Sequence, residues 1–97
     1  MPARLKNPHP GEILKEEFLA PLGLSQNRLA RAIGVPPNRI HDIVRGRRSV
    51  TADTDLRLGR YFELSEGYWL RLQNAFDLME ARRASPKALD RIAPHAA

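Results

Sequence analysis

The segment from Leu24 to Thr51 constrains the fold most, because its pattern predicts two short helices joined by a tight turn. Ser25 is a typical residue for capping the start of a helix, and Gly34 can adopt the left-handed conformation that ends one. Pro37 cannot extend the first helix but suits the first turn of a second. One apolar face is predicted in each helix, formed by Leu29, Ala30 and Ile33 and then by Ile40, Ile43 and Val44. This pattern is typical of a helix-turn-helix motif.

The same segment carries the excess positive charge of the chain. Residues 25–48 contain six arginines and one acidic residue, Asp42, which gives a net charge of +5, equal to the formal net charge of the whole chain. The rest of the sequence is therefore balanced in charge. A compact two-helix unit that carries the whole positive excess favours binding to a polyanion.

The rest of the chain predicts an all-α fold of one small domain. Ninety-seven residues suffice for a single helical core, and no segment shows the alternation of apolar and polar residues that is typical of a β-strand. Thr51 and Ser65 are expected to cap two later helices. Besides the two helices above, we expect three more, at about residues 10–20, 52–62 and 66–83.

The expected organisation has three parts. We assign residues 1–8 to a flexible basic arm, residues 9–83 to a helix-turn-helix domain with a dimerising fifth helix, and residues 84–97 to a C-terminal tail that can form a short helix. The chain has no cysteine, no apolar segment as long as a membrane span and no N-terminal signal region. We therefore expect a cytoplasmic protein without disulfides or membrane contact.

Several stretches of the sequence resemble one known family. The residues LARAIGV and IVRG resemble the XRE-like (phage-repressor-like) helix-turn-helix family, and the flanks HPGEILKEEFLAPLGLS (9–25) and SEGYWLRLQNAF (65–76) resemble HigA-type antitoxins, the VapI-like branch. The resemblance implies a five-helix fold. It also implies that the protein represses its own operon and directly binds a small cognate toxin, a RelE-like ribonuclease. One departure is Pro36, where the family usually has Ser or Thr capping the second helix of the motif.

The first turn of the first helix in the motif contains no acidic residue. Its free backbone amides, with the side chains as additional donors, are predicted to bind a phosphate group. The alternative is an ordinary solvated turn. The residues assigned to this contact are Ser25, Gln26, Asn27 and Arg28.

The outward face of the second helix is predicted to read base edges. Asparagine suits adenine, arginine suits guanine, and a carboxylate can accept a hydrogen bond from cytosine. The resemblance implies base contacts at Pro37, Asn38 and Asp42; because Pro37 has no side-chain donor or acceptor, we expect Asn38, Arg39 and Asp42 to carry most of the readout. The alternative for Asp42 is an ion pair with Arg39 or Arg45 at helical spacing.

The segment after the second helix is predicted to contact the sugar-phosphate backbone of DNA. The residues assigned to it are Arg45, Arg47, Arg48 and Thr51, and His41 on the helix is assigned to a phosphate or surface position. The alternative is a solvated run of charge. Arg57 is interleaved with acids and is assigned to ordinary surface, and Asp53 and Asp55 are assigned to the N-terminal turn of the next helix, where acidic residues are favourable.

The fifth predicted helix carries an apolar stripe at helical spacing, formed by Trp69, Leu72, Phe76 and Met79. We interpret it as core plus a homodimer interface, because helix-turn-helix proteins usually read two half-sites of a palindromic operator. The alternative is that the whole stripe belongs to the core.

No feature of the sequence favours an enzyme. His9, His41 and His95 are isolated, and no catalytic, metal-binding or cofactor motif is present, so we expect no catalytic residue, no metal and no cofactor. The expected partners are double-stranded DNA, a cognate toxin and a second copy of the chain. The alternatives are a stand-alone XRE-like regulator without a toxin, and a protein-interaction module on a helix-turn-helix scaffold.

Three surfaces are candidates for binding the toxin, because the face that binds DNA is expected to be separate. They are the arm before His9, the first-helix face with Lys15 and Glu16, and the tail after Ser85 with Leu89 and Ile92.

Overall fold

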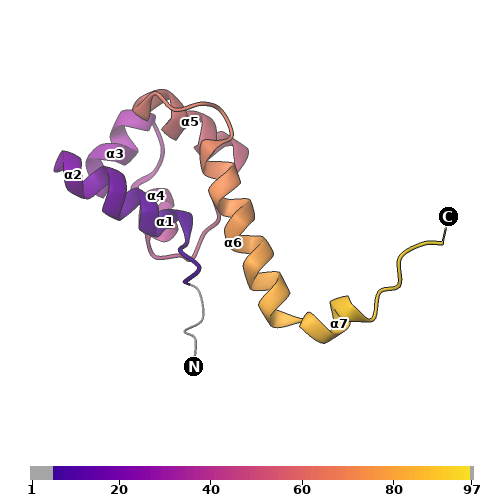
Figure 1. Ribbon diagram of the computed structural model, residues 1–97. Coiled ribbons are helices and arrows are strands. Elements are labelled where there is room, and N and C mark those ends of the chain that lie inside the picture. Colours follow the sequence, from indigo (N-terminus) through magenta and orange to yellow (C-terminus); the bar gives the residue numbers. More distant parts are fainter. Residues whose placement is uncertain (1–5, 97) are drawn as a thin grey trace.

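The computed structural model describes residues 6–96, and the regular elements in that range are all helical (Figure 1). They are α1 (Pro10–Ile13), η1 (Leu14–Leu19), α2 (Ala20–Leu22), α3 (Gln26–Ile33), α4 (Pro37–Val44), α5 (Ala52–Phe62), α6 (Tyr68–Ala84) and α7 (Pro86–Asp90). The first three form one continuous helix, so the predicted all-α fold with five helices and a short C-terminal helix is confirmed. Residues 1–5 of the predicted arm and residue 97 lie outside the described residues. Within the described part, no helix combines the length and apolar character of a membrane span.

The first helix departs from regular α geometry in its middle. Between Leu14 and Leu19 the backbone forms a π-helix, in which the N–H of Ala20 donates to the carbonyl of Lys15, five residues back. This widened turn lies just before Pro21, whose ring would crowd a carbonyl of the preceding turn in a regular α-helix. The apolar spacing in the sequence predicted an ordinary helix and did not indicate the π-helical segment.

The core lies where the first helix, α3, α4, α5 and the start of α6 meet. Its fully buried apolar residues are Leu14, Leu29, Ala30, Ile40, Ile43, Leu58 and Trp69. The ring of Phe18 packs against Phe62, Tyr68 and Trp69, which joins the first helix to α5 and α6. The assignment of Trp69 to a dimer interface was therefore wrong, because its own domain encloses the indole ring completely.

Helix α1 lies against the C-terminal end of α4, and a glycine permits the contact. A Cβ atom on Gly11 would overlap the carbonyl group of Ile43 and lie 2.8 Å from the Cα of Val44. His9 stands at the N-cap position of α1, where its Nδ1 accepts a hydrogen bond from the N–H of Gly11 at 3.0 Å. The His9 ring also packs edge-on against Phe76 at 4.9 Å, so the start of α1 contacts both α4 and α6.

The N-terminus of α6 is capped by a residue of α5, and the prediction that Ser65 caps this helix was wrong. Oδ2 of Asp55 accepts a hydrogen bond from the N–H of Gly67 at 2.7 Å. Its Oδ1 accepts from the N–H groups of Trp69 and Leu70 at 2.8 and 3.1 Å. Asp55 lies in the first turn of α5, as predicted, but the sequence did not indicate that it is only 2% exposed or that it caps α6. Negative charge at a helix N-terminus is favourable, so this carboxylate fixes α6 to α5.

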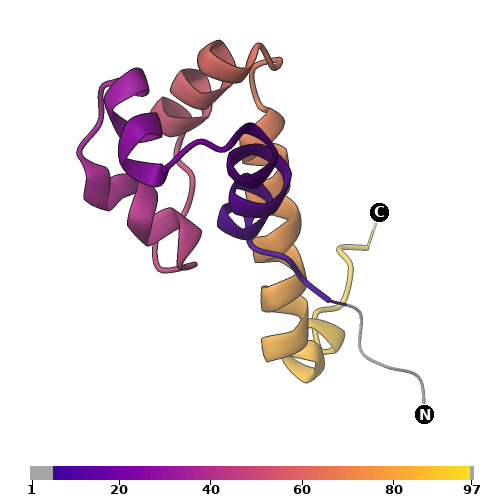
Figure 2. The ribbon, with the colours of Figure 1, turned by 90° about the vertical axis from the view of Figure 1, so that its left-hand side faces the viewer.

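Helix α6 also holds the loop that follows α4. The buried side chain of Gln73 accepts a hydrogen bond from the N–H of Val50 at 2.8 Å and donates one to Asp77 at 3.0 Å. Beyond this point α6 extends away from the other helices, and α7 lies at its far end (Figures 1 and 2). Figure 2 also shows the first helix lying against the first half of α6.

Candidate nucleic-acid interface

The start of α3 has the geometry predicted for it. Ser25 caps the helix, as its Oγ accepts a hydrogen bond from the N–H of Arg28 at 3.1 Å, and the first turn contains no acidic residue. A hollow opens at this helix start. Its lining residues are Ser25, Gln26, Asn27, His41 and Arg45, all assigned to the interface from the sequence. Polar side chains, an arginine and a helix N-terminus without acidic residues thus surround a site of a kind that suits an anion.

A side-chain hydrogen bond joins the two helices of the motif beside this hollow. The amide oxygen of Asn27 on α3 and Nε2 of His41 on α4 are 2.9 Å apart, with the imidazole N–H as the donor. The structure thus brings together two residues that are 14 positions apart in the sequence. Their spacing gave no indication of this contact, which fixes the start of α3 relative to the outer face of α4.

Helix α4 buries Ile40 and Ile43 and leaves its predicted reading face outward. Asn38 and Arg45 are exposed, and Asp42 is half-buried. In residues 6–96 no ion pair joins Asp42 to Arg39 or Arg45. The alternative assignment of Asp42, to an ion pair with Arg39 or Arg45, is therefore wrong.

The N-terminus of α4 differs from that of α3 in having no side-chain cap. Pro36 occupies the N-cap position with extended backbone, and Pro37 begins the helix. A proline at the first helical position has the required φ and leaves no amide donor without a partner. The departure of Pro36 from the family pattern therefore removes a capping hydroxyl but leaves the helix start in place.

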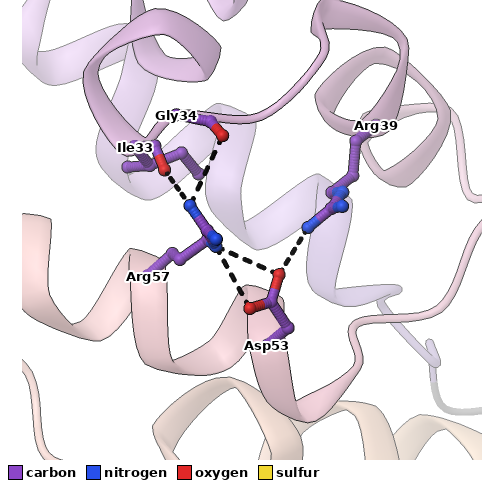
Figure 3. Close-up of polar contacts among 5 residues, drawn as sticks. All are labelled: Ile33, Gly34, Arg39, Asp53 and Arg57. Carbon is purple, nitrogen blue, oxygen red and sulfur yellow. Dashed lines mark hydrogen bonds and ion pairs between the residues drawn. The ribbon is translucent and has the colours of Figure 1, made fainter.

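Arg39 is the reading-face residue whose surroundings the sequence did not predict. Its Nη1 donates to Oδ2 of Asp53, the second residue of α5, at 2.7 Å (Figure 3). Asp53 also accepts from Nε of Arg57 at 3.0 and 3.2 Å. The hydrogen bonds from Arg39 and then Arg57 hold the pKa of the Asp53 carboxyl below its usual value of 3.8. The carboxylate is thus ionised between two guanidinium groups.

Arg57 extends this contact to the end of α3. Its Nη1 donates to the carbonyl oxygens of Ile33 and Gly34, at 2.8 and 3.4 Å (Figure 3). Gly34 has φ +73°, so its left-handed conformation ends α3 as predicted. The assignment of Arg57 to ordinary surface was wrong, because Arg57 and Asp53 link α3, α4 and α5. Asp53 lies in the first turn of α5, as predicted.

The loop after α4 presents its arginines to solvent. Arg47 and Arg48 are exposed, and the loop turns at Gly46, which has φ +74°. Thr51 stands at the N-cap position of α5 but its hydroxyl forms no capping hydrogen bond, which corrects the predicted cap. A second hollow lies here, lined by Arg39, Arg48, Ser49, Thr51, Asp53 and Thr54.

The two hollows lie on opposite sides of α4. The first contains His41 and Arg45, one helical turn apart, and the second contains Arg39. Of the six arginines in residues 25–48, Arg39 is the one with an ion pair inside the described part of the chain. The others are exposed without one: Arg28, Arg31, Arg45, Arg47 and Arg48. Arg45 lines the first hollow and Arg48 lines the second, so exposed positive charge without an ion pair flanks α4.

The predicted stripe on α6 divides into an inner and an outer part. Leu72 packs against the core and Phe76 contacts His9, so both are largely covered within the domain. Met79 is half-buried, whereas its neighbour Leu78 is 58% exposed. On the tail beyond, Leu89 and Ile92 are also exposed. In this part of the molecule the exposed apolar side chains are thus Leu78, beside the predicted stripe, and Leu89 and Ile92 on the tail.

Several known proteins are similar to this chain in sequence and in fold. A family model described as helix-turn-helix matches residues 14–69. Virulence-associated protein I of Dichelobacter nodosus is 55% identical over 75 residues, which cover 77% of this chain and 69% of that protein. Antitoxin HigA-1 of Vibrio cholerae is 36% identical over 72 residues, covering 74% and 68%. The structure of Pseudomonas aeruginosa antitoxin HigA with the higBA promoter is 41% identical and superposes with a TM-score of 0.88, covering 94% of this chain and all of that one.

Proposed function

Because this chain belongs to the HigA-type (VapI-like) branch of the XRE-like helix-turn-helix family, we propose that it binds DNA sequence-specifically and represses its own operon. The observation that carries the proposal is the face around α4, where exposed arginines without ion pairs surround polar side chains. A related antitoxin has been solved with promoter DNA.

In the proposed complex α4 enters the major groove. Asn38 and Asp42 lie at the centre of its outward face, and we assign base contacts to them and to Arg39. The start of α3 and the loop with Arg47 and Arg48 then meet phosphates on either side of the groove. These phosphate contacts hold the register of the protein on DNA, and α4 carries the sequence preference.

The test of this assignment compares two classes of variant on operator and random duplexes. Asn38→Ala is expected to cost roughly 1–3 kcal/mol of binding free energy on the operator and little on random DNA. Arg47→Ala is expected to weaken binding to both duplexes by similar factors, since phosphates carry no sequence information. Equal losses on both duplexes for both variants would refute the assignment of base contacts to α4.

We also propose that the protein is a homodimer joined through the outer part of α6. Leu78 on that helix is 58% exposed and lies beside the half-buried Met79. A dimer of this kind must place two copies of α4 about 34–36 Å apart to meet successive major grooves of a palindromic operator. Leu78→Glu should give a helical monomer with weak operator binding in analytical ultracentrifugation and gel-shift assays. Leu22→Glu, at a leucine that is 63% exposed on α2, is the matched control and should leave the dimer intact.

The second part of the proposed function is neutralisation of a small RelE-like ribonuclease toxin by direct binding. A relative in Vibrio cholerae is named antitoxin HigA-1, and the tail of this chain exposes Leu89 and Ile92 on and after α7. One protein that both represses and neutralises needs separate surfaces, and α7 lies far from α4 (Figure 1). We therefore favour the tail over the first-helix face as the toxin contact.

Co-expression with the product of the adjacent gene tests this part. We expect the two proteins to co-purify and the chain to rescue cells that express the toxin. A truncation ending at Ser85 should retain DNA binding and lose rescue. Full rescue by the truncated chain would place the toxin contact on the first helix or the arm. DNA binding without any co-purifying partner would indicate a stand-alone regulator, and a partner without DNA binding would indicate an interaction module.

A further inference from the structure

One exposed carboxylate on α5 connects the reading face of α4 with the end of α3. Asp53 accepts hydrogen bonds from Arg39 on one side and from Arg57 on the other (Figure 3). Arg57 in turn donates to the carbonyls of Ile33 and Gly34, at the last turn of α3. Three helices of the domain therefore meet at this carboxylate.

The contacts of Arg57 restrict the position of the Asp53 carboxylate. Arg57 lies one helical turn after Asp53 on α5 and also donates to the carbonyl of Ile33, so its guanidinium group links the carboxylate to the end of α3. Oδ2 of Asp53 then receives Nη1 of Arg39 at 2.7 Å, a short bond between two charged groups. The orientation of Arg39 thus depends on α5 and α3 as well as on its own helix.

This bond uses only part of the guanidinium group of Arg39. The group has five N–H donors in a rigid plane, so holding Nη1 fixes the direction of Nε and Nη2 as well. Within residues 6–96, the Arg39 side chain donates a hydrogen bond to Asp53 and to no other residue, and the side chain is 28% exposed. Donors therefore remain for a guanine edge, which arginine contacts through two parallel hydrogen bonds to O6 and N7.

We propose that Asp53 is a positioning residue for sequence readout, which holds the guanidinium of Arg39 in the orientation that meets a guanine in the major groove. The proposal rests on the DNA binding proposed above. An arginine held in place by a carboxylate loses less conformational freedom on binding than a free one. Asp53 does not touch the base; it acts through Arg39.

Two effects of removing the charge of Asp53 separate this role from a purely electrostatic one. Asp53→Asn takes a negative charge away from a surface that faces phosphates, which strengthens binding to any DNA sequence. If Asp53 also positions Arg39, the same change weakens the preference for guanine at one operator position. We expect this preference to fall roughly tenfold, at the low end of what an arginine–guanine contact contributes.

The experiment measures the dissociation constants of four proteins on three kinds of duplex. The proteins are the wild type, Asp53→Asn, Arg39→Ala and the double variant. The duplexes are the operator from its own promoter, the same operator with each guanine replaced in turn, and a random sequence. We expect Asp53→Asn to lose guanine preference at the position that Arg39→Ala also affects, and to cause no further loss in the Arg39→Ala background. The melting temperatures of all four proteins are measured, so that unfolding is not mistaken for lost readout.

Glu66→Gln is the matched control. It removes one exposed acid from the loop before α6 that takes no part in the hydrogen bonds of Asp53, Arg39 and Arg57, and it should leave guanine preference unchanged. A wild-type protein that does not distinguish operator from random DNA would overturn the proposed function itself. A selective wild type whose guanine preference survives in both Asp53→Asn and Asp53→Ala would overturn only the positioning role. A gain in affinity for operator and random DNA alike, with guanine preference intact, would show that Asp53 acts only through its charge, which also overturns the positioning role.

Discussion

Replacing Asp55 by asparagine should destabilise the whole domain, because this side chain joins α5 to the start of α6. The asparagine has nearly the same shape, and its single oxygen can still accept from the N–H groups of Trp69 and Leu70. Its NH₂ group would then face the N–H of Gly67, so that two donors lie where a 2.7 Å hydrogen bond now exists. The variant also loses the negative charge at the helix N-terminus.

The size of the effect follows from these losses. One hydrogen bond to a charged group contributes about 1.5–3 kcal/mol. The charge at the helix N-terminus adds about 0.3–1 kcal/mol. Relief from burying a carboxylate offsets part of the sum. We expect the free energy of unfolding to fall by about 2–3 kcal/mol, which for a domain of this size lowers the melting temperature by roughly 10–20 °C.

Urea denaturation checks this value with two probes. Circular dichroism reports the helices, and the fluorescence of Trp69, the one tryptophan of the chain, reports the start of α6. The control is Glu66→Gln, which removes an exposed acid next to the same helix start and should change stability by less than about 0.5 kcal/mol. Asp55→Ala, which removes all three acceptor contacts, should be worse than Asp55→Asn. If Asp55→Asn and Asp55→Ala both match the control, the reasoning about this cap is wrong.

Three further outcomes are expected. The operator affinity should fall steeply with salt, since log K changes by about 0.9 per phosphate contacted for each unit of log salt; a flat salt dependence would contradict the arginine face. Gly11→Ala should cost more than about 2 kcal/mol by urea denaturation because its Cβ overlaps the backbone of α4, whereas Gly23→Ala, with open space around it, adds only left-handed strain of about 1–2 kcal/mol. Burial lowers the pKa of His9, although the charge of Asp77 opposes this shift. The stability that the neutral ring contributes is therefore complete above pH 6.5 and is lost as the pH falls through the lowered pKa. His9→Asn, which keeps a capping acceptor, should reduce the change in urea midpoint between pH 7.5 and 5, and an unchanged pH dependence would rule out His9 as its source.

The features predicted correctly from the sequence are those that neighbouring residues determine. Ser25 caps α3 and Gly34 ends it, because a cap and a left-handed turn are local properties of the backbone. The buried face of α4 follows from the spacing of Ile40 and Ile43.

The features that the sequence did not predict depend on contacts between distant segments. Asp55 and Gln73 have side chains that usually lie at the surface, and only the packing of α5 and α6 encloses them. Arg57 reaches the end of α3, 24 positions away, so no local spacing marks it. The sequence did not show that its own domain encloses Trp69 completely, since a helical period cannot tell which turns of a long helix pack against the core.

The hydrogen bond from Val50 to Gln73 has a consequence for how such proteins can change their targets. It ties the loop that carries Arg47 and Arg48 directly to α6, the helix that we propose joins the two protomers. The separation of the half-sites would then be encoded in α6 and this buried amide, and the bases of each half-site in the outward residues of α4. These two sets of residues do not overlap along the chain. A gene duplicate can therefore acquire a new operator sequence through changes in α4 alone while the spacing of its palindrome is inherited unchanged.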